Sequence, residues 1–266
     1  MNSYLKKAAQ FFLPRRTFTT LQSIRSRNSQ QSSFKELGIA DATREMADQY
    51  GLAVLGGPFR GMKYSRQSLL SRNGISLIFG TYEMELHSII GEAISRRYDK
   101  IIDIGCAEGY YSVGLAMRTG AMVHAFDCEP RERFHCRRMA YENAVGDRVQ
   151  VSSWCDEATL RKLTAGRCLI ICDCEGFEVE LFSADTVAAL KHCDLIIELH
   201  EVFATSVHNL ILDRFQETHQ AEFIPSDKFL RSPLVPQKWA DYSRESRTGG
   251  QEWVHLRARI YLGSAG

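Results

Sequence analysis

The chain of 266 residues is 44% hydrophobic and 24% charged, which is enough apolar material for one buried core and typical of a globular domain. Its formal net charge of +1 argues against a protein that binds nucleic acid mainly through phosphate contacts, because such proteins usually carry a basic excess. No apolar run reaches the ~20 residues that a membrane-spanning helix needs.

The cysteines do not indicate a disulfide framework. There are eight, most of them in or beside apolar runs, and the chain is too long to depend on disulfides for its stability. Buried thiols in a reducing compartment are the better interpretation, so a cytoplasmic location is expected. Neither the cysteines nor the histidines show the close-spaced ligand pairs of a zinc finger, and no structural metal site is predicted from them.

The N-terminal segment, residues 1–35, has a distinct composition. It has no acidic residue, and its gaps are filled by Ser, Thr, Gln and Asn. Its basic residues are Lys6, Lys7, Arg15, Arg16, Arg25, Arg27 and Lys35. This composition predicts a flexible extension, while two alternatives stay open: peripheral contact with an anionic membrane or acidic partner, and a mitochondrial transit peptide.

Residues 36–98 are predicted to form a helical and turn-rich cap region. A helix is expected over 36–50, and the glycines and proline of residues 51–64 indicate turns or a hairpin. Apolar residues at helical spacing predict an amphipathic helix over 82–98.

From residue 99 onward the pattern changes to short apolar runs that alternate with amphipathic segments. Strands are predicted at 100–104, 121–126, 149–153, 168–172, 194–199, 219–224 and 253–261. Helices are predicted at 110–118, 131–143, 157–163, 177–190 and 206–218. This alternation is typical of right-handed crossovers, so residues 99–266 are expected to form one α/β domain with a doubly wound, mostly parallel sheet.

The most informative local motif is Asp103-Ile-Gly105-Cys106-Ala-Glu-Gly109, which follows an apolar strand and opens a helix. Gly105 permits a tight turn, Gly109 lets the helix approach closely, and the first NH groups of the helix face a ligand across the strand end. The spacing Gly-x-x-x-Gly lacks the second early glycine of dinucleotide folds. It therefore favours a nucleoside without a pyrophosphate.

Two further acids follow the next strands. Asp127 ends the second strand about 20 residues after the glycine turn, where an acid accepts hydrogen bonds from ribose hydroxyls. Asp156, shortly after the third strand, is placed to meet an adenine amino group. Helix capping is the structural alternative for both residues, and for Asp156 the two interpretations carry equal weight.

The fourth and fifth strands end in carboxylates and one histidine. Asp173 and Glu175 follow the fourth strand, and His200 follows the fifth. Because ligands bind at the carboxyl ends of the strands in open α/β sheets, these three residues are the predicted catalytic group, able to orient an acceptor hydroxyl or to take its proton. The same cluster is chemically compatible with a divalent cation such as Mg²⁺, although a metal is not expected.

Together these segments resemble a class I S-adenosylmethionine-dependent methyltransferase. The Asp-x-Glu-Gly-x-Glu stretch from Asp173 to Glu178 is similar to the FkbM-type branch, whose members include O-methyltransferases of sugars and macrolides. The resemblance implies a Rossmann-like sheet of seven strands whose C-terminal strand is antiparallel. It also implies that the turn from Asp103 through Gly105 and Cys106 to Gly109 borders the methionine part of S-adenosylmethionine, and that Asp127 binds its ribose.

The leading hypothesis is therefore methylation of a hydroxyl on a sugar, a glycan or a small metabolite, with S-adenosylmethionine as cofactor. A non-catalytic binding module that docks through the basic N-terminal segment is the first alternative. An NAD-dependent oxidoreductase is less favoured, because the glycine spacing does not fit and no Tyr-x-x-x-Lys pair is present. Nucleic acid is not expected as a partner.

Overall fold

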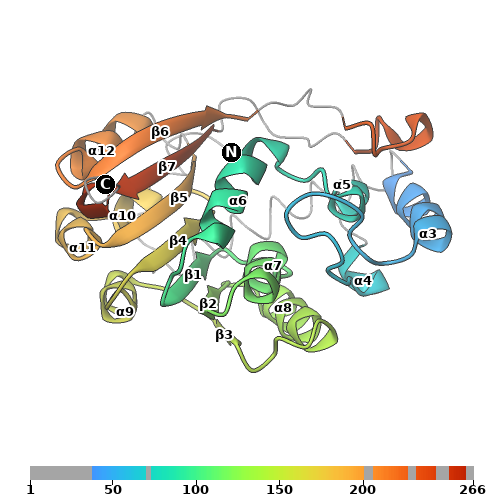
Figure 1. Ribbon diagram of the computed structural model, residues 1–266, viewed down its shortest axis with the longest axis horizontal. Coiled ribbons are helices and arrows are strands. Elements are labelled where there is room, and N and C mark those ends of the chain that lie inside the picture. Colours follow the sequence, from blue (N-terminus) through green and yellow to red (C-terminus); the bar gives the residue numbers. More distant parts are fainter. Residues whose placement is uncertain (1–37, 70–72, 201–205, 227–231, 244–251, 262–266) are drawn as a thin grey trace, which may run out of the picture.

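The computed structural model describes residues 38–69, 73–200, 206–226, 232–243 and 252–261, and the N-terminal basic segment lies outside them. One sheet of seven strands runs through the molecule in the order β3-β2-β1-β4-β5-β7-β6 (Figure 1). Its strands are β1 (Lys100–Ile104), β2 (Met122–Phe126), β3 (Val149–Ser152), β4 (Cys168–Cys172), β5 (Cys193–Leu199), β6 (His219–Pro225) and β7 (Glu252–Ala258). β1 to β5 pair in parallel, whereas β7 is antiparallel to both of its neighbours. This arrangement confirms the predicted fold class, including the antiparallel C-terminal strand.

The sheet is covered on both faces because its buried strands are apolar on both sides. Ile101 packs into one hydrophobic cluster and Ile102 into the other, as the two-residue period of a strand requires. The first cluster is closed by α6 (His87–Ser95), α7 (Tyr110–Arg118) and α8 (Pro130–Glu142). The second is closed by α9 (Glu157–Leu163), α10 (Glu178–Leu181), α11 (Ala184–Ala189) and α12 (Val207–Phe215).

The residues before β1 pack onto the first face of the sheet. They form α3 (Ile39–Tyr50), α4 (Arg66–Leu69), α5 (Gly74–Phe79) and a 3-10 turn, η1 (Met84–Leu86). The Phe59 ring meets Tyr110 of α7 edge-on at 4.9 Å between centroids, and Arg118 donates to the carbonyl oxygens of Pro58 and Arg60. A single bridge between Ala53 and Lys63 is the described pairing in the predicted turn region. The predicted domain boundaries themselves remain a prediction.

Several predicted elements differ in their extent. The helix predicted over 177–190 is two helices, because the chain leaves the helical conformation at Phe182 and the Ser183 side chain caps α11 by accepting from the Thr186 N–H. The last strand ends at Ala258 and continues as a 3-10 turn, η3 (Arg259–Tyr261). The loop before it contains the 3-10 turn η2 (Gln237–Trp239). Among the described residues, no helix is both long and apolar enough to cross a membrane.

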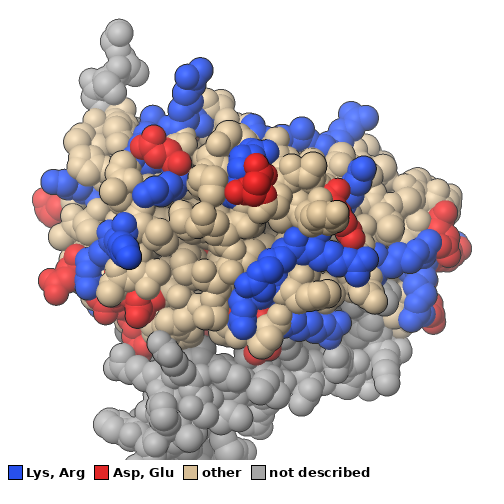
Figure 2. Space-filling view, turned by 90° about the horizontal axis from the view of Figure 1, so that it is seen from below, with Lys and Arg blue, Asp and Glu red and all other residues tan. Residues whose placement is uncertain are grey.

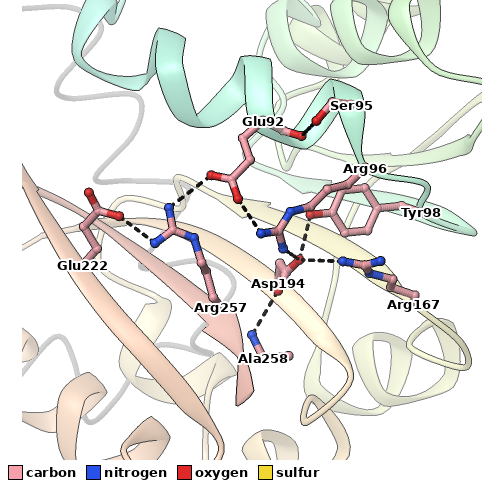
Figure 3. Close-up of polar contacts among 9 residues, drawn as sticks. All are labelled: Glu92, Ser95, Arg96, Tyr98, Arg167, Asp194, Glu222, Arg257 and Ala258. Atoms are coloured by element: carbon pink, nitrogen blue, oxygen red, sulfur yellow. Dashed lines mark hydrogen bonds and ion pairs between the residues drawn. The ribbon is translucent and has the colours of Figure 1, made fainter. Parts of the chain in front are cut away.

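A polar network holds the amino end of β5. Asp194, 1% exposed, accepts hydrogen bonds from Arg96 at 2.9 Å, from the Tyr98 hydroxyl at 2.8 Å and from the Ala258 N–H at 2.9 Å. Arg167 forms an ion pair with the same carboxylate at 3.8 Å. Figure 3 shows this network together with its outer members Glu92, Ser95, Glu222 and Arg257. The segment between α6 and β1 is thereby tied to the far half of the sheet.

Candidate functional site

The glycine turn after β1 is fixed between two neighbouring strands. The N–H groups of Gly105 and Cys106 both donate to the Phe126 carbonyl oxygen at the end of β2, at 2.8 and 2.9 Å. On its other side the turn touches the end of β4: a Cβ added to Gly105, whose φ is +88°, would lie 1.6 Å from the Asp173 carbonyl oxygen. No other residue fits there without moving β4, so the sequence requirement for glycine is steric as well as conformational.

The start of α7 is equally close-packed. Gly109 has a φ of +102° and precedes the helix, and a Cβ there would lie 2.9 Å from Cys136 Sγ of α8. Cys106 is buried at the same point, and its contact with Cys136 together with burial raises the pKa of its thiol well above the usual value. Cys106 is thus a neutral packing group, and its predicted contact with the cofactor stays a prediction.

Asp103 is buried below this turn. It is 2% exposed, and its carboxylate accepts a hydrogen bond from the Ser112 hydroxyl on α7. Burial raises its pKa to about 7, against the opposing effect of the Ser112 hydrogen bond. Asp103 therefore anchors the start of α7 to β1. Its predicted position beside the methionine part of a cofactor is not tested by these contacts.

Asp127 links the loops that follow β1 and β2. One carboxylate oxygen accepts from the Ala107 N–H at 3.0 Å, and the other accepts from the Glu129 N–H at 2.7 Å. The side chain is half-buried at the carboxyl end of β2. Because each carboxylate oxygen can accept more than one hydrogen bond, these contacts orient the group and leave it the capacity to accept from ribose hydroxyls. Its predicted contact with a ribose stays a prediction.

Asp156 caps a helix. It precedes α9, and its side chain accepts from the Thr159 N–H at 2.9 Å. The capping interpretation that the sequence left open is confirmed, while the adenine contact remains a prediction.

His200 gathers the carboxylates that follow β4 and β5. Its Nδ1 lies 2.9 Å from Glu178 Oε1, and its Nε2 lies 3.6 Å from Asp173 Oδ1 and 3.9 Å from Glu175 Oε2. Glu198, on β5 itself, brings a further carboxylate oxygen to 3.6 Å from Nε2. The three residues predicted as a catalytic group are therefore neighbours in space, as the parallel pairing of β4 with β5 requires.

Glu178 is the functional residue whose role the sequence did not disclose. Its side chain is 0% exposed, and besides His200 it accepts from the Cys174 and Gly176 N–H groups at 3.4 and 3.3 Å. It thereby holds the loop in which Glu175 takes the left-handed conformation at φ +56°. A non-glycine residue in that conformation costs free energy and is common at ligand sites. The signal that could have found Glu178 is a glutamate shortly after the end of β4, because the neighbouring strand β5 is followed by a histidine.

The electrostatics at this end of the sheet favour a positive charge. Burial alone would lower the pKa of His200, but the hydrogen bond from its ring to Glu178 and the nearby Asp173 and Glu175 carboxylates raise it to about 9. One oxygen each of Asp173 and Glu175 and one nitrogen of His200 also lie within 4.8 Å of one another, which is close enough for three ligands of a metal ion.

Asp173 connects the two halves of the site. Its backbone oxygen abuts Gly105 of the predicted cofactor turn, while its side chain faces His200. Its N–H donates to the Ile104 carbonyl oxygen at 2.9 Å, which keeps β4 in register with β1 at this edge. The predicted cofactor turn and the predicted catalytic group are therefore adjacent parts of one site.

The comparisons with known proteins agree in fold only. No protein-family model and no curated protein matches the chain. Among solved structures it is similar to a precorrin-8w decarboxylase from Methanobacterium thermoautotrophicum, at 15% identity and a TM-score of 0.47 over 66% of this chain and 90% of that one. It is similar to a geranyl diphosphate methyltransferase in complex with GPP and sinefungin, at 14% identity and 0.42 over 66% and 82% of the chains. It is also similar to an rRNA methylase from Streptococcus thermophilus, at 12% identity and 0.46 over 65% and 96%.

Proposed function

We propose that this protein is an S-adenosylmethionine-dependent methyltransferase of the FkbM type, acting on a hydroxyl of a sugar, a glycan or a small metabolite. The observation that carries the proposal is the position of Asp173, which touches the glycine turn with its backbone and the His200 cluster with its side chain. A cofactor bound across the ends of β1 and β2 would bring its reactive part to this junction.

The residues around the turn suit a nucleoside cofactor. Asp127 is held by two backbone N–H groups in an orientation that can accept from ribose hydroxyls, and the turn from Gly105 to Gly109 brings backbone close to the strand ends. S-adenosylmethionine supplies a methyl group already activated on a sulfonium. The protein's own task is accordingly to align an acceptor oxygen and to remove its proton.

Asp173, Glu175 and His200 are the residues proposed for that task. Glu175 is 77% exposed at the side chain and Asp173 35% exposed, so both are accessible to an acceptor, whereas His200 is 8% exposed and fixed from behind by Glu178. A carboxylate within hydrogen-bond reach of an acceptor hydroxyl can take its proton, and the imidazole can hold the same oxygen in place.

The charge pattern is compatible with a small acceptor, because the basic side chains of α8 have local partners. Figure 2 shows a band of Lys and Arg side chains with acidic groups at its margins, on the side of the molecule where α8 lies in Figure 1. Arginines of α8 also have local partners: Arg133 donates to the Asp127 carbonyl oxygen and Arg137 to that of Val151, both at 2.8 Å. Arg138 pairs with Glu142.

Isothermal titration tests the cofactor assignment. The full chain should bind S-adenosylmethionine and S-adenosylhomocysteine and should not bind NAD. Asp127→Ala should weaken both by about 10- to 100-fold, because hydrogen bonds to a charged group are lost. Asp147→Ala, which removes an exposed acid before β3, is the matched control and should bind like the unaltered protein. Binding of NAD alone, or unchanged affinity in a folded Asp127→Ala protein, would overturn the assignment.

A further inference from the structure

We propose that Asp173, Glu175 and His200 bind a divalent first-row transition-metal ion, of which Mn²⁺ is the test case. The site lies at the carboxyl ends of β4 and β5. Sequence alone left a metal chemically compatible but not expected, and the inference comes from how the histidine ring is held.

The orientation of the ring is determined by Glu178. A carboxylate offers only acceptors, so the 2.9 Å contact with Glu178 Oε1 places a hydrogen on His200 Nδ1. At neutral pH the raised pKa of about 9 leaves a second proton on Nε2, which a metal ion would displace to reach that nitrogen. This atom is buried, and it has no hydrogen-bond partner among the described residues. The side chain as a whole is 8% exposed.

Nε2 faces a group of carboxylate oxygens that attract a positive charge. Carboxylate oxygens of Asp173, Glu175 and Glu198 lie 3.6, 3.9 and 3.6 Å away. These distances exceed a normal hydrogen bond, so a proton on Nε2 would not bond well to any of them. A metal ion in the place of that proton would instead contact the ring nitrogen and several carboxylate oxygens at once.

The spacing of the ligand atoms matches a coordination sphere. Two ligands about 2.1 Å from one ion lie about 3 Å apart at a right angle and about 4.2 Å apart when opposite. The distances from Nε2 to Asp173 and Glu175 fall within that range, and all three ligand atoms lie within 4.8 Å of one another.

Glu178 provides the support that metal-bound histidines usually have. Histidine ligands commonly donate their second ring N–H to a carboxylate, which fixes the ring and makes the other nitrogen a better ligand. Glu178 does this from a fully buried position on α10, held by the N–H groups of Cys174 and Gly176. Burying the Glu178 carboxylate costs free energy. Its contact with Nδ1 leaves Nε2 as the ring nitrogen that can bind an ion.

The ligand set also indicates the kind of ion. Ca²⁺ and Mg²⁺ prefer oxygen ligands throughout, whereas imidazole suits first-row transition metals and carboxylates suit Mn²⁺. One imidazole with two carboxylates leaves coordination positions for water or a substrate oxygen. If the proposed methyltransferase function holds, on which this step rests, the ion would bind the acceptor hydroxyl and lower its pKa.

The test uses Mn²⁺ alone. Bound Mn²⁺ is measured from the loss of the electron paramagnetic resonance signal of the free ion, in the full chain freed of metal by a chelator and without any cofactor. We expect one strong site per chain. His200→Gln and Glu175→Gln should each weaken Mn²⁺ binding about tenfold or more, and Glu178→Gln should weaken it by about 10- to 100-fold. Glu180→Gln, an exposed neighbour on α10, is the charge-matched control and should bind normally.

The possible results test the metal site, the role of the imidazole and the proposed function separately. Because Glu175 is mostly exposed, its variant should fold normally, and weaker Mn²⁺ binding there supports the site without a folding artefact. Absence of a Mn²⁺ site, or unchanged affinity in both His200→Gln and Glu175→Gln, would overturn the metal proposal. Displacement of Mn²⁺ by an equal concentration of Ca²⁺ would contradict the role of the imidazole. Titration of S-adenosylmethionine in the presence of chelator decides the proposed function independently, whichever way the metal result falls.

Discussion

Strand β5 has a buried carboxylate near each end, and the two ends are built in different ways. Near the amino end, Asp194 is matched by the guanidinium groups of Arg96 and Arg167 and by neutral donors (Figure 3). Near the carboxyl end, Glu198 lies with Asp173 against one imidazole, that of His200. A carboxylate fully matched by cations stabilises a fold. The carboxylates near the His200 ring raise its pKa, and shifted pKa values are common at functional sites. The comparison therefore sets a structural use of buried charge, near the amino end, beside the functional use that we propose near the carboxyl end.

The largest expected effect is on the structural end. Asp194→Ala should lower the free energy of unfolding by about 3–5 kcal/mol, because it removes the buried acceptor shared by the Tyr98 hydroxyl, the Ala258 N–H and two arginines. Urea denaturation measures the loss. Asp48→Ala removes an ion pair with Arg66 whose side chains are 64% and 58% exposed, and should cost about 0–1 kcal/mol. At temperatures where the Asp194 variant remains folded, it should still bind S-adenosylmethionine. A small loss of stability would contradict the structural role assigned to this end of the strand.

The functional end should respond in the opposite way. Asp173→Asn keeps the shape of the side chain but removes its charge, so methyl transfer should fall by about 10²- to 10³-fold. Because this side chain is 35% exposed, whereas that of Asp194 is 1% exposed, the free energy of unfolding should change by less than about 1 kcal/mol. Turnover with an acceptor found by screening and urea denaturation of the same preparation measure both quantities. A loss of stability as large as that of Asp194→Ala would show that the two ends do not differ as described.

The sequence predicted the strands and most of the helices that carry these residues, but not the contacts between the residues. The strands were predicted to within a few residues, because continuous apolar runs between polar turns leave little choice of buried segment. The short helices α4 and α5 were not predicted. α5 is buried along its whole length, so its sequence has no amphipathic period. The long helix predicted over 177–190 ignored the capping capacity of Ser183.

For the site, the sequence likewise predicted which residues lie together but not the contacts between them. The position of Asp173 and His200 at adjacent strand ends follows from topology, and topology follows from the alternation of strands and helices. The bond between His200 and Glu178 depends on how the chain turns between β4 and α10, which includes the left-handed backbone at Glu175. A non-glycine residue takes the left-handed conformation because of its tertiary contacts, and local sequence preferences do not predict it.

The smallest expected effect concerns the pH dependence of stability and involves Asp103, the buried acid below the predicted cofactor turn. Its pKa is raised from 3.8 to about 7, mainly by burial, so between these values the folded protein holds a proton that the unfolded chain has lost. Its contribution to stability is therefore greatest below about pH 4 and falls as the pH rises through about 7. Asp103→Asn stays neutral and lacks this dependence.

We expect the decline in unfolding free energy between pH 5.5 and pH 8.5 to be smaller in Asp103→Asn than in the unaltered protein, by roughly 2 kcal/mol. Urea denaturation at the two pH values measures it, and groups that titrate equally in both proteins cancel in the difference. A parallel decline in the two proteins would mean that Asp103 is ionised in the fold at both pH values. Asp103 would then be, like Asp194, a buried carboxylate that stays charged in the folded protein. The residues around His200 would in that case be the ones that still differ from Asp194.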